Sequence, residues 1–444
     1  MKIQLSDHFT YKTLLRFTFP SIVMMVFSSI YGVVDGFFVS NFAGKTPFAA
    51  VNFIMPFLMI LGAVGFMFGT GGSALIAKTL GEGDKKRANF LFSLFVYASF
   101  FIGVLIAVLG IVFLRPVAKG LGASGELLDH CVVYGRIILI ALPAFMLQMA
   151  FQSFFVTAEK PTLGLVFTIA SGITNILLDG LFVGVFSWGL IGAAVATALS
   201  QVVGGFGPLF YFFRKNSGLL QLGKTRFDGK ALLKACTNGS SELMSNISMS
   251  IVGMLYNMQL MKFAGEDGVA AYGVIMYVNF IFISAFIGYC IGIAPIVGYH
   301  FGAGNKDELK GVRRKSVIIL LAFSIGMFAL AELLAVPLSK IFVSYDQGLL
   351  DMTVRGFAIC SFSFLFAGIA IFGSSFFTAL GNGLISAIVS FLRTLVFQIS
   401  AVMLLPQIGN LGLDGIWLSV IVAEVMAVVV NVVFLVSFRK KYGY

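Results

Sequence analysis

The chain has 444 residues, of which 59% are apolar and only 11% are charged, and its mean hydropathy is +0.99. Soluble domains carry about 25% charged residues, so these values exclude a soluble globular protein and indicate a chain solvated mostly by lipid. The formal net charge is +11, but the basic residues form short clusters between apolar runs, which reports membrane topology and argues against a nucleic-acid partner.

Apolar runs long enough to cross a bilayer recur from residue 14 to residue 438. A spanning helix needs roughly 20 mostly apolar residues. The first run continues past Ser40 without a small-residue cleavage site, so we expect a span and not a cleaved signal peptide. The predicted spans are 14–40, 48–77, 89–114, 128–157, 162–185 and 189–213, then 236–263, 269–298, 315–343, 353–379, 384–406 and 412–438. We therefore expect an all-α membrane protein with an N-lobe (1–213), a linker (214–234) and a C-lobe (235–444).

Two further expectations concern the segments outside the spans. With the N-terminus inside, the loops on that side collect most of the 30 Lys and Arg residues, and the positive-inside rule then places both termini in the cytoplasm.

In the linker, Asp228 stands before a short amphipathic stretch and can cap a helix lying along the membrane surface. A simple charged connector is the alternative for this segment.

The two sets of six spans repeat each other in sequence. The loop Leu80-Gly-Glu-Gly-Asp84 reappears as Phe301-Gly-Ala-Gly-Asn305 at a shift of 221 residues, and Gly189-Leu-Ile-Gly192 reappears as Gly412-Leu-Asp-Gly415 at a shift of 223. A nearly constant shift indicates duplicated halves. Because each half has an even number of spans, both halves cross the membrane in the same direction. We expect two six-helix lobes related by a pseudo-twofold axis along the membrane normal.

Ionisable side chains within spans are costly and mark candidate functional sites. In the first half, Asp35 lies late in the first span, and Asn175 and Asp179 lie four residues apart, on one face of the fifth span. With the hydroxyl of Thr197 in the sixth span, they offer hard oxygen ligands for a sodium ion, and the carboxyl pair can equally carry a proton. These four residues are the predicted cation-coupling site, and a metal site if the ion is Na+. A helix-helix hydrogen bond is the structural alternative for Asp179.

The second half cannot duplicate this site. The repeat shift places Tyr256 at the position of Asp35 and Ala401 at the position of Asp179. The predicted coupling group therefore belongs to the first half alone.

The second half has its own charged residues within spans: Glu242, Glu332, Glu424 and one base, Arg393. Glu242 lies near a helix N-terminus, where a structural carboxylate stabilised by the helix dipole and a role in cation or substrate binding are both consistent with the sequence. We expect Glu424 or Glu332 to pair with Arg393. Glu242, Glu424 and Arg393 are the candidates for substrate binding or secondary coupling.

Signatures of other chemistries are absent from the sequence. It has no phosphate-binding Walker loop and no nucleophile elbow, and its three histidines are isolated. ATP-driven transport, hydrolysis and a bound cofactor are therefore not expected.

The four cysteines stand singly, at positions 131, 236, 290 and 360. The 18 Met and 49 Phe residues suit an adaptable, aromatic cavity wall for flat organic cations.

Five short segments together resemble the multidrug and toxic compound extrusion (MATE) transporters, and the resemblance covers essentially the whole chain. The segments are Val34-Asp-Gly-Phe-Phe-Val39, Leu80-Gly-Glu-Gly-Asp84, Asn175-Ile-Leu-Leu-Asp179, Gly192-Ala-Ala-Val-Ala-Thr197 and Gly239-Ser-Ser-Glu242. The resemblance implies a V-shaped pair of six-helix lobes that opens alternately to either side and exports amphipathic, often cationic compounds in exchange for H+ or Na+.

The resemblance also implies roles for particular residues. The cation site that some family members have in the N-lobe matches Asp35, Asn175, Asp179 and Thr197, and Glu242 matches the family's acid in the seventh span. Some members have an acidic residue in the tenth span, whereas residues 356–364 contain none. This departure argues against a C-lobe cation site built on that acid.

The sequence thus predicts a secondary active multidrug exporter and not an enzyme. It is expected to be a monomer in the cell membrane, in contact with lipid and with small organic cations or other xenobiotics. A lipid-linked oligosaccharide flippase is the near alternative, although Arg136, Arg355 and Arg393 are few for a diphosphate headgroup. A membrane-embedded enzyme using Asp35 and Asp179 as an acid-base pair and a channel are the more distant alternatives.

Overall fold

A computed structural model describes residues 3–216, 218–344, 346–409 and 411–444, and over these residues the chain is helical with no β-strand. The helices of the first half are α1 (Tyr11–Phe38), α2 (Lys45–Gly81), α3 (Lys85–Gly120), α4 (Gly125–Ile140), α5 (Leu142–Thr157), α6 (Pro161–Asp179) and α7 (Gly189–Phe213). Those of the second half are α8 (Gly229–Gly302), α9 (Lys306–Val343), α10 (Gln347–Ser361), α11 (Phe364–Ala379), α12 (Gly383–Phe391), α13 (Gln398–Leu404) and α14 (Gly412–Tyr442).

The helices make twelve membrane crossings. Within the described ranges, nine helices are long and apolar enough to cross a bilayer, and two bent pairs, α4 with α5 and α10 with α11, meet the same criterion as pairs. α8 is 74 residues long, but its backbone turns at Gly265 (φ 63°, ψ −152°). A straight helix of that length would measure about 110 Å, against a hydrocarbon core of about 30 Å, so α8 supplies two crossings. The predicted twelve-helix, two-lobe architecture is confirmed.

Two predicted spans are bent rather than straight. The span predicted over 128–157 is α4 and α5, which meet at an angle of 57°, and the span predicted over 353–379 is α10 and α11, which meet at 50°. Pro143 occupies the first turn of α5, where its ring and missing N–H prevent α4 from continuing. The bend before Phe364 stands at the equivalent place of the second half without a proline, and nothing in the local sequence explains it.

Asp228 caps a helix, but that helix is α8 itself. The Asp228 carboxylate accepts a hydrogen bond from the N–H of Ala231 at 3.0 Å, and Arg87 Nη2 donates to it at 2.7 Å. The hydrogen bond from Arg87 is the main cause that holds the pKa of Asp228 below its usual value. The separate surface helix considered for this segment is therefore wrong, since α8 begins at Gly229 and takes in the end of the predicted linker.

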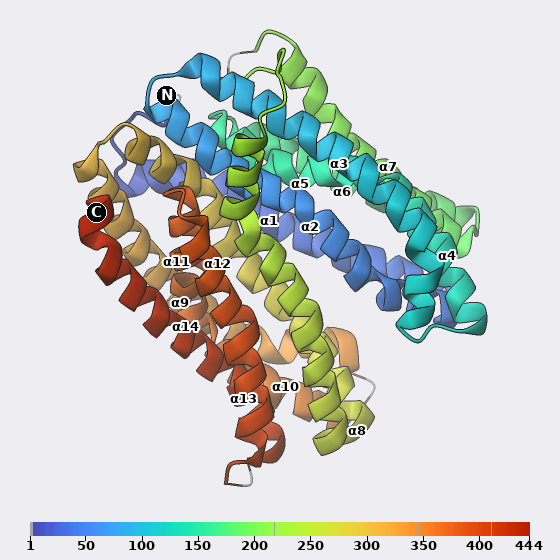
Figure 1. The fold of residues 1–444 in the computed structure, drawn as a ribbon. Coiled ribbons are helices and arrows are strands. Elements are labelled where there is room, and N and C mark those ends of the chain that lie inside the picture. The colour runs from blue at the N-terminus through green and yellow to red at the C-terminus, as the bar shows by residue number, and fades with distance from the viewer. Residues whose placement is uncertain (1–2, 217, 345, 410) are drawn as a thin grey trace.

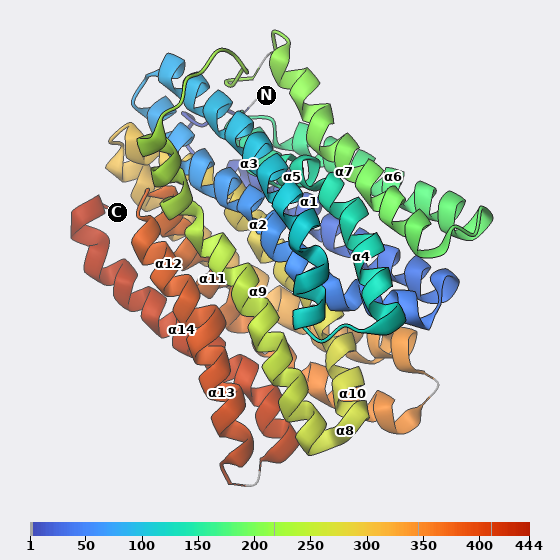
Figure 2. The ribbon, with the colours of Figure 1, turned by 45° about the vertical axis from the view of Figure 1, so that its right-hand side comes forward.

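The two halves form two groups of helices. Figure 1 shows α1–α7 as one group and α8–α14 as the other. The groups lie together at the end of the molecule that holds both termini, and they diverge toward the opposite end (Figures 1 and 2). We call the closed end the terminal end.

Glycines bring α2 and α8 into backbone contact at the terminal end. A Cβ added to Gly81 would lie 2.0 Å from the carbonyl oxygen of Tyr299, and one added to Gly302 would lie 2.0 Å from that of Lys78. The repeat shift exchanges these two contacts, so they are related by the pseudo-twofold axis. Helices approach this closely in membranes only where small residues face each other, so we expect the closed terminal end to depend on both glycines.

The segment before α1 connects the two lobes at this end. In this N-terminal strap (residues 3–10), the N–H of Leu5 donates to Glu159 Oε1 of the first half at 2.7 Å. The N–H of Phe9 donates to Glu308 Oε1 of the second half at 2.8 Å, and His8 Nδ1 donates to the other oxygen of Glu308 at 2.6 Å. Leu5 and Phe9 are fully buried. The strap therefore bonds to both lobes and links them at the terminal end.

We expect Glu308→Ala to loosen the strap. The substitution removes two hydrogen bonds to a charged group, each worth roughly 1.5–3 kcal/mol, so amide exchange in a peptide covering residues 3–10 should accelerate by about tenfold or more. Hydrogen-exchange mass spectrometry measures this directly. The matched control is Asp307→Ala, which removes the neighbouring, exposed carboxylate and should leave the exchange unchanged. Equal protection in both variants would show that Glu308 does not hold the strap.

Candidate functional site

The structure brings the four predicted coupling residues together inside the N-lobe. Asp35 comes from the last turns of α1, Asn175 and Asp179 from the end of α6, and Thr197 from α7. Thr197 Oγ1 donates to Asp35 Oδ1 at 3.3 Å, and Asn175 Nδ2 donates to Thr197 Oγ1 at 3.5 Å. Three helices thus converge on one polar cluster, which we call the carboxylate site. Its function remains a prediction.

Asp179 is the unusual member of the carboxylate site. Its side chain is fully buried, and within the described chain no amide, hydroxyl or basic group donates to either carboxyl oxygen, so that its one polar neighbour is the Asp35 carboxyl. The Asp35 carboxyl lies close enough to act on it electrostatically. A buried carboxylate without a donor costs several kcal/mol, and a second carboxylate beside it adds repulsion. A proton or a small cation between the two carboxyls would remove both costs, and the carboxylate, amide and hydroxyl oxygens suit a hard cation.

Local backbone irregularities accompany the charged residues of the membrane interior. α1 continues after Phe38 into a π-helical turn, Val39–Ala43, and α6 continues after Asp179 into another, Gly180–Val185. Arg393 lies in a third, Leu392–Phe397. Such turns are rare and occur frequently at functional sites. The sequence contains no proline or other marker that could have predicted them.

Tyr134 is a neighbour of the carboxylate site that sequence reasoning missed. Its side chain is fully buried on α4, and its phenol lies within electrostatic reach of both Asp35 and Asp179. A tyrosine among many apolar aromatic residues gives no signal in the sequence, because only the packing of α4 against the other helices shows what it faces.

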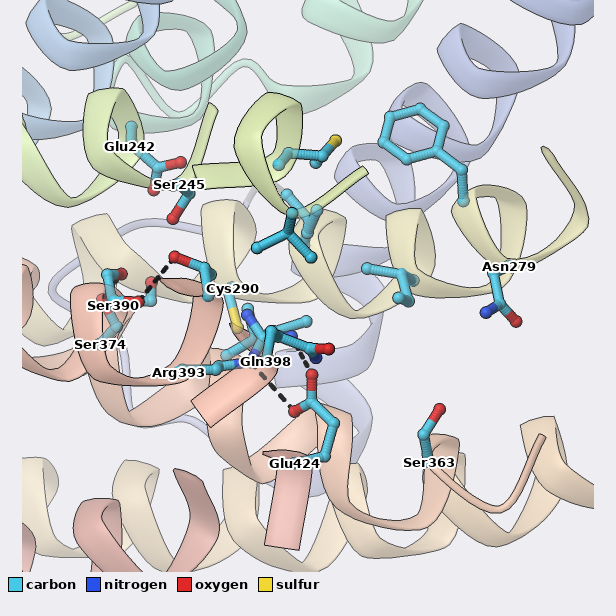
Figure 3. A pocket seen from close by; sticks show the side chains of 18 of the residues that line it. Glu242, Ser245, Asn279, Cys290, Ser363, Ser374, Ser390, Arg393, Gln398 and Glu424 are labelled. Atoms are coloured by element: carbon cyan, nitrogen blue, oxygen red, sulfur yellow. Dashed lines mark hydrogen bonds and ion pairs between the residues drawn. The ribbon is translucent and has the colours of Figure 1, made fainter. Parts of the chain in front are cut away.

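A second polar region lies in the C-lobe. A cavity of about 260 Å³ is lined by α8 and by helices α10 to α14, with Thr70 and Ser73 of α2 and Ser153 of α5 closing it on the N-lobe side. Glu242 and Ser245 from the first part of α8 face Cys290 from its second part (Figure 3). Its walls also include stacked Tyr256 and Tyr272 rings, with centroids 5.1 Å apart, and apolar side chains. We call this space the C-lobe cavity.

The C-lobe cavity contains an ion pair and an additional acid. Arg393 forms a two-point contact with Glu424, with Nε to Oε2 at 3.0 Å and Nη2 to Oε1 at 2.9 Å (Figure 3). The predicted partner of Arg393 is therefore Glu424 and not Glu332, which accepts a hydrogen bond from Ser361. Within the described chain, the Glu242 carboxyl has no hydrogen-bond donor, although the charge of Arg393 acts on it.

These features define a polytopic helical membrane protein with two six-helix lobes and polar sites at membrane depth, the class to which many secondary transporters belong. A family model described as MatE matches residues 20–181 and, a second time, residues 243–404. The chain therefore belongs to the MatE family. The second match repeats the first in the other half, as the internal repeat requires.

Individual relatives agree with this assignment. The chain is 25% identical to the multidrug export protein MepA of Staphylococcus saprophyticus over 93% of this chain and 91% of MepA, and 25% identical to MepA of Staphylococcus haemolyticus over 97% and 94%. A solved outward-facing structure of a multidrug resistance MATE family transporter superposes with a TM-score of 0.92 at 22% identity, over 97% of this chain and 96% of that one. A MATE crystal structure in complex with MaL6 superposes with a TM-score of 0.91 at 22% identity, over the same shares.

Proposed function

We propose that this protein is a secondary active exporter that moves amphipathic organic cations out of the cell in exchange for H+ or Na+. The observation that carries the proposal is the buried Asp179 carboxylate beside Asp35, which lacks a donor and so calls for an exchangeable cation. The relatives named multidrug export proteins support the substrate class. The protein acts in the cell membrane, with both termini in the cytoplasm, and catalyses no chemical reaction.

In this proposal the carboxylate site and the C-lobe cavity have different tasks. The carboxylate site takes the coupling cation, and the C-lobe cavity takes the organic cation, whose charge is matched by the unbonded carboxyl of Glu242. Exchange of the two ligands calls for each to weaken the binding of the other, and linkage then makes the two effects equal in size. The conformation described here, closed at the terminal end, is then the outward-facing one.

α1 provides the connection between the two sites. It carries Asp35, and a few residues earlier Ser29 Oγ lies 3.3 Å from Ser284 Oγ of α8, the helix that lines much of the cavity. Around Asp35, a Cβ added at Gly32 or Gly36 would meet no atom within 4 Å. α1 therefore has room to move when a cation removes the repulsion between Asp35 and Asp179, and such a movement changes the wall of the cavity.

The cavity lining also separates this proposal from the flippase alternative. A diphosphate headgroup requires unpaired basic side chains. Among the residues that line the C-lobe cavity, Arg393 is the single cationic side chain, and Glu424 already occupies its guanidinium. The lining therefore favours a cationic ligand over a diphosphate.

Inside-out membrane vesicles test the proposal. Export from the cell corresponds to uptake into such vesicles, so ethidium should accumulate when the lumen contains the higher concentration of H+ or of Na+. Vesicles without the protein are the control. Uptake driven by one gradient supports the exporter and identifies its coupling ion, whereas no uptake under either gradient contradicts it and favours the flippase or enzyme alternatives.

A further inference from the structure

Among the described residues, one basic and two acidic side chains line the C-lobe cavity, and the base compensates one of the acids. Arg393 and Glu424 form a bidentate ion pair whose side chains are only 16% and 6% exposed. Arginine keeps its charge under all physiological conditions, so Glu424 is neutralised permanently. Glu242 has no donor within the described residues and is the remaining acid of the cavity, so it supplies one uncompensated negative charge when it is ionised.

Arg393 lies between the two acids. Figure 3 shows its guanidinium directed at Glu424, with Glu242 on the opposite side of the cavity. Its charge acts on Glu242 as well as on Glu424. A ligand that brings one positive group to Glu242 leaves the ion pair intact. A second positive group on the ligand would be repelled by the guanidinium. It could reach the Glu424 carboxylate only by breaking the buried ion pair, which is strongly unfavourable.

We propose that Arg393 determines the charge selectivity of the C-lobe cavity, so that it favours organic monocations over dications. The inference rests on the proposed function, in which this cavity takes organic cations. Selectivity of this kind depends on how many uncompensated charges the cavity presents. Arg393 leaves only the charge of Glu242 uncompensated, because it neutralises Glu424.

The shape of the cavity agrees with a flat monocation. The stacked rings of Tyr256 and Tyr272 and the side chains of Met249 and Phe280 present apolar and aromatic surface, which attracts planar cationic rings. Glu242 then provides one charged contact. Nothing else among the described lining residues offers a second free carboxylate.

Ethidium and propidium are suitable probes, since they share one ring system and carry one and two positive charges respectively. We expect purified wild-type protein in detergent to bind ethidium about tenfold or more tightly than propidium in equilibrium fluorescence titrations. Arg393→Gln frees Glu424 and should shift the affinity ratio by about tenfold toward propidium. Propidium is also bulkier than ethidium, but the same two dyes are compared across variants, so a change in their ratio reports the protein's charge.

The double variant Arg393→Gln with Glu424→Gln is the matched control. It loses the ion pair but keeps the net charge of the wild-type cavity, so its affinity ratio should return to within about threefold of the wild-type value. Glu424→Gln alone leaves Arg393 to neutralise Glu242, and ethidium affinity should fall by about tenfold. If Arg393→Gln does not give a monodisperse protein, the comparison between Glu424→Gln and the double variant tests the same inference.

The outcomes separate this inference from the function on which it rests. Suppose that wild-type protein binds ethidium, but that Arg393→Gln and the double variant change the affinity ratio to the same extent or leave it unchanged. Arg393 then has only a structural role, and the inference is wrong. If wild-type protein binds neither dye, the cavity does not take organic cations, and the proposed function and this inference both fail.

Discussion

Asp179→Asn should abolish ion-driven uptake of ethidium into inside-out vesicles. The substitution preserves the size of the side chain but removes the charge that a coupling cation neutralises beside Asp35. Breaking a buried charge arrangement of this kind costs roughly 3–5 kcal/mol, so the initial rate should fall by about a hundredfold or more. Asp35→Asn should have the same effect, because neither acid alone makes a shared cation site.

Two controls show whether the loss of ethidium uptake comes from lost ion coupling and not from a general defect of the protein. Asp129→Asn removes an exposed carboxylate that pairs with Arg115 at the surface, where both side chains are mostly exposed, and uptake should remain at the wild-type rate. In buffer of low Na+ and low H+ concentration, where the coupling cation is not bound to either protein, equilibrium binding of ethidium to purified Asp179→Asn should also remain within about threefold of wild type, since the C-lobe cavity lies in the other lobe. Normal ion-driven uptake by Asp179→Asn would refute the assignment of the carboxylate site.

Gly81→Ala and Gly302→Ala should each open the terminal end of the molecule. The new Cβ would lie 2.0 Å from a backbone carbonyl oxygen of the opposite lobe, and backbone cannot move aside as a flexible side chain can. Overpacking of this kind costs roughly 1–3 kcal/mol, enough to shift a balanced two-state equilibrium by about fivefold to a hundredfold. Because the pseudo-twofold axis exchanges the two contacts, the two variants should behave alike.

Distance measurements between spin labels test this expectation. Labels at the exposed positions Lys86 and Asp307 report on the two lobes at the terminal end, in a background without the four native cysteines. Both glycine variants should show a longer distance than the parent protein and a lower rate of ethidium uptake. Gly326→Ala is the control, since a Cβ there meets no atom within 4 Å. An unchanged distance distribution in Gly81→Ala and Gly302→Ala would show that the glycines do not hold the lobes together.

The pseudo-twofold axis relates the helix contacts and bends of the two halves but not their polar sites. The glycine contacts of α2 and α8 and the bends before Leu142 and Phe364 occur in both halves. The carboxylate site exists only in the first half, and the ion pair of Arg393 and Glu424 only in the second. A duplicated scaffold with two different polar sites suits a protein in which one lobe takes the coupling ion and the other takes the substrate.

The sequence alone determined the membrane crossings, the repeat and the identity of the residues at membrane depth. This was possible because lipid leaves backbone groups no partner outside the helix, so hydropathy reports the crossings directly. The grouping of Asn175 with Asp179 was also accessible, since a spacing of four residues is a local property of a helix.

The tertiary structure alone decided which distant side chains meet. That Arg393 pairs with Glu424 and not with Glu332, that Tyr134 lies near Asp35, and that Glu308 holds the strap all depend on the rotation of each helix about its axis. Those rotations follow from packing between segments far apart in the chain, which no local pattern records. The bend before Phe364 and the π-helical turns were also visible only in the structure, since nothing in the residues that form them explains them.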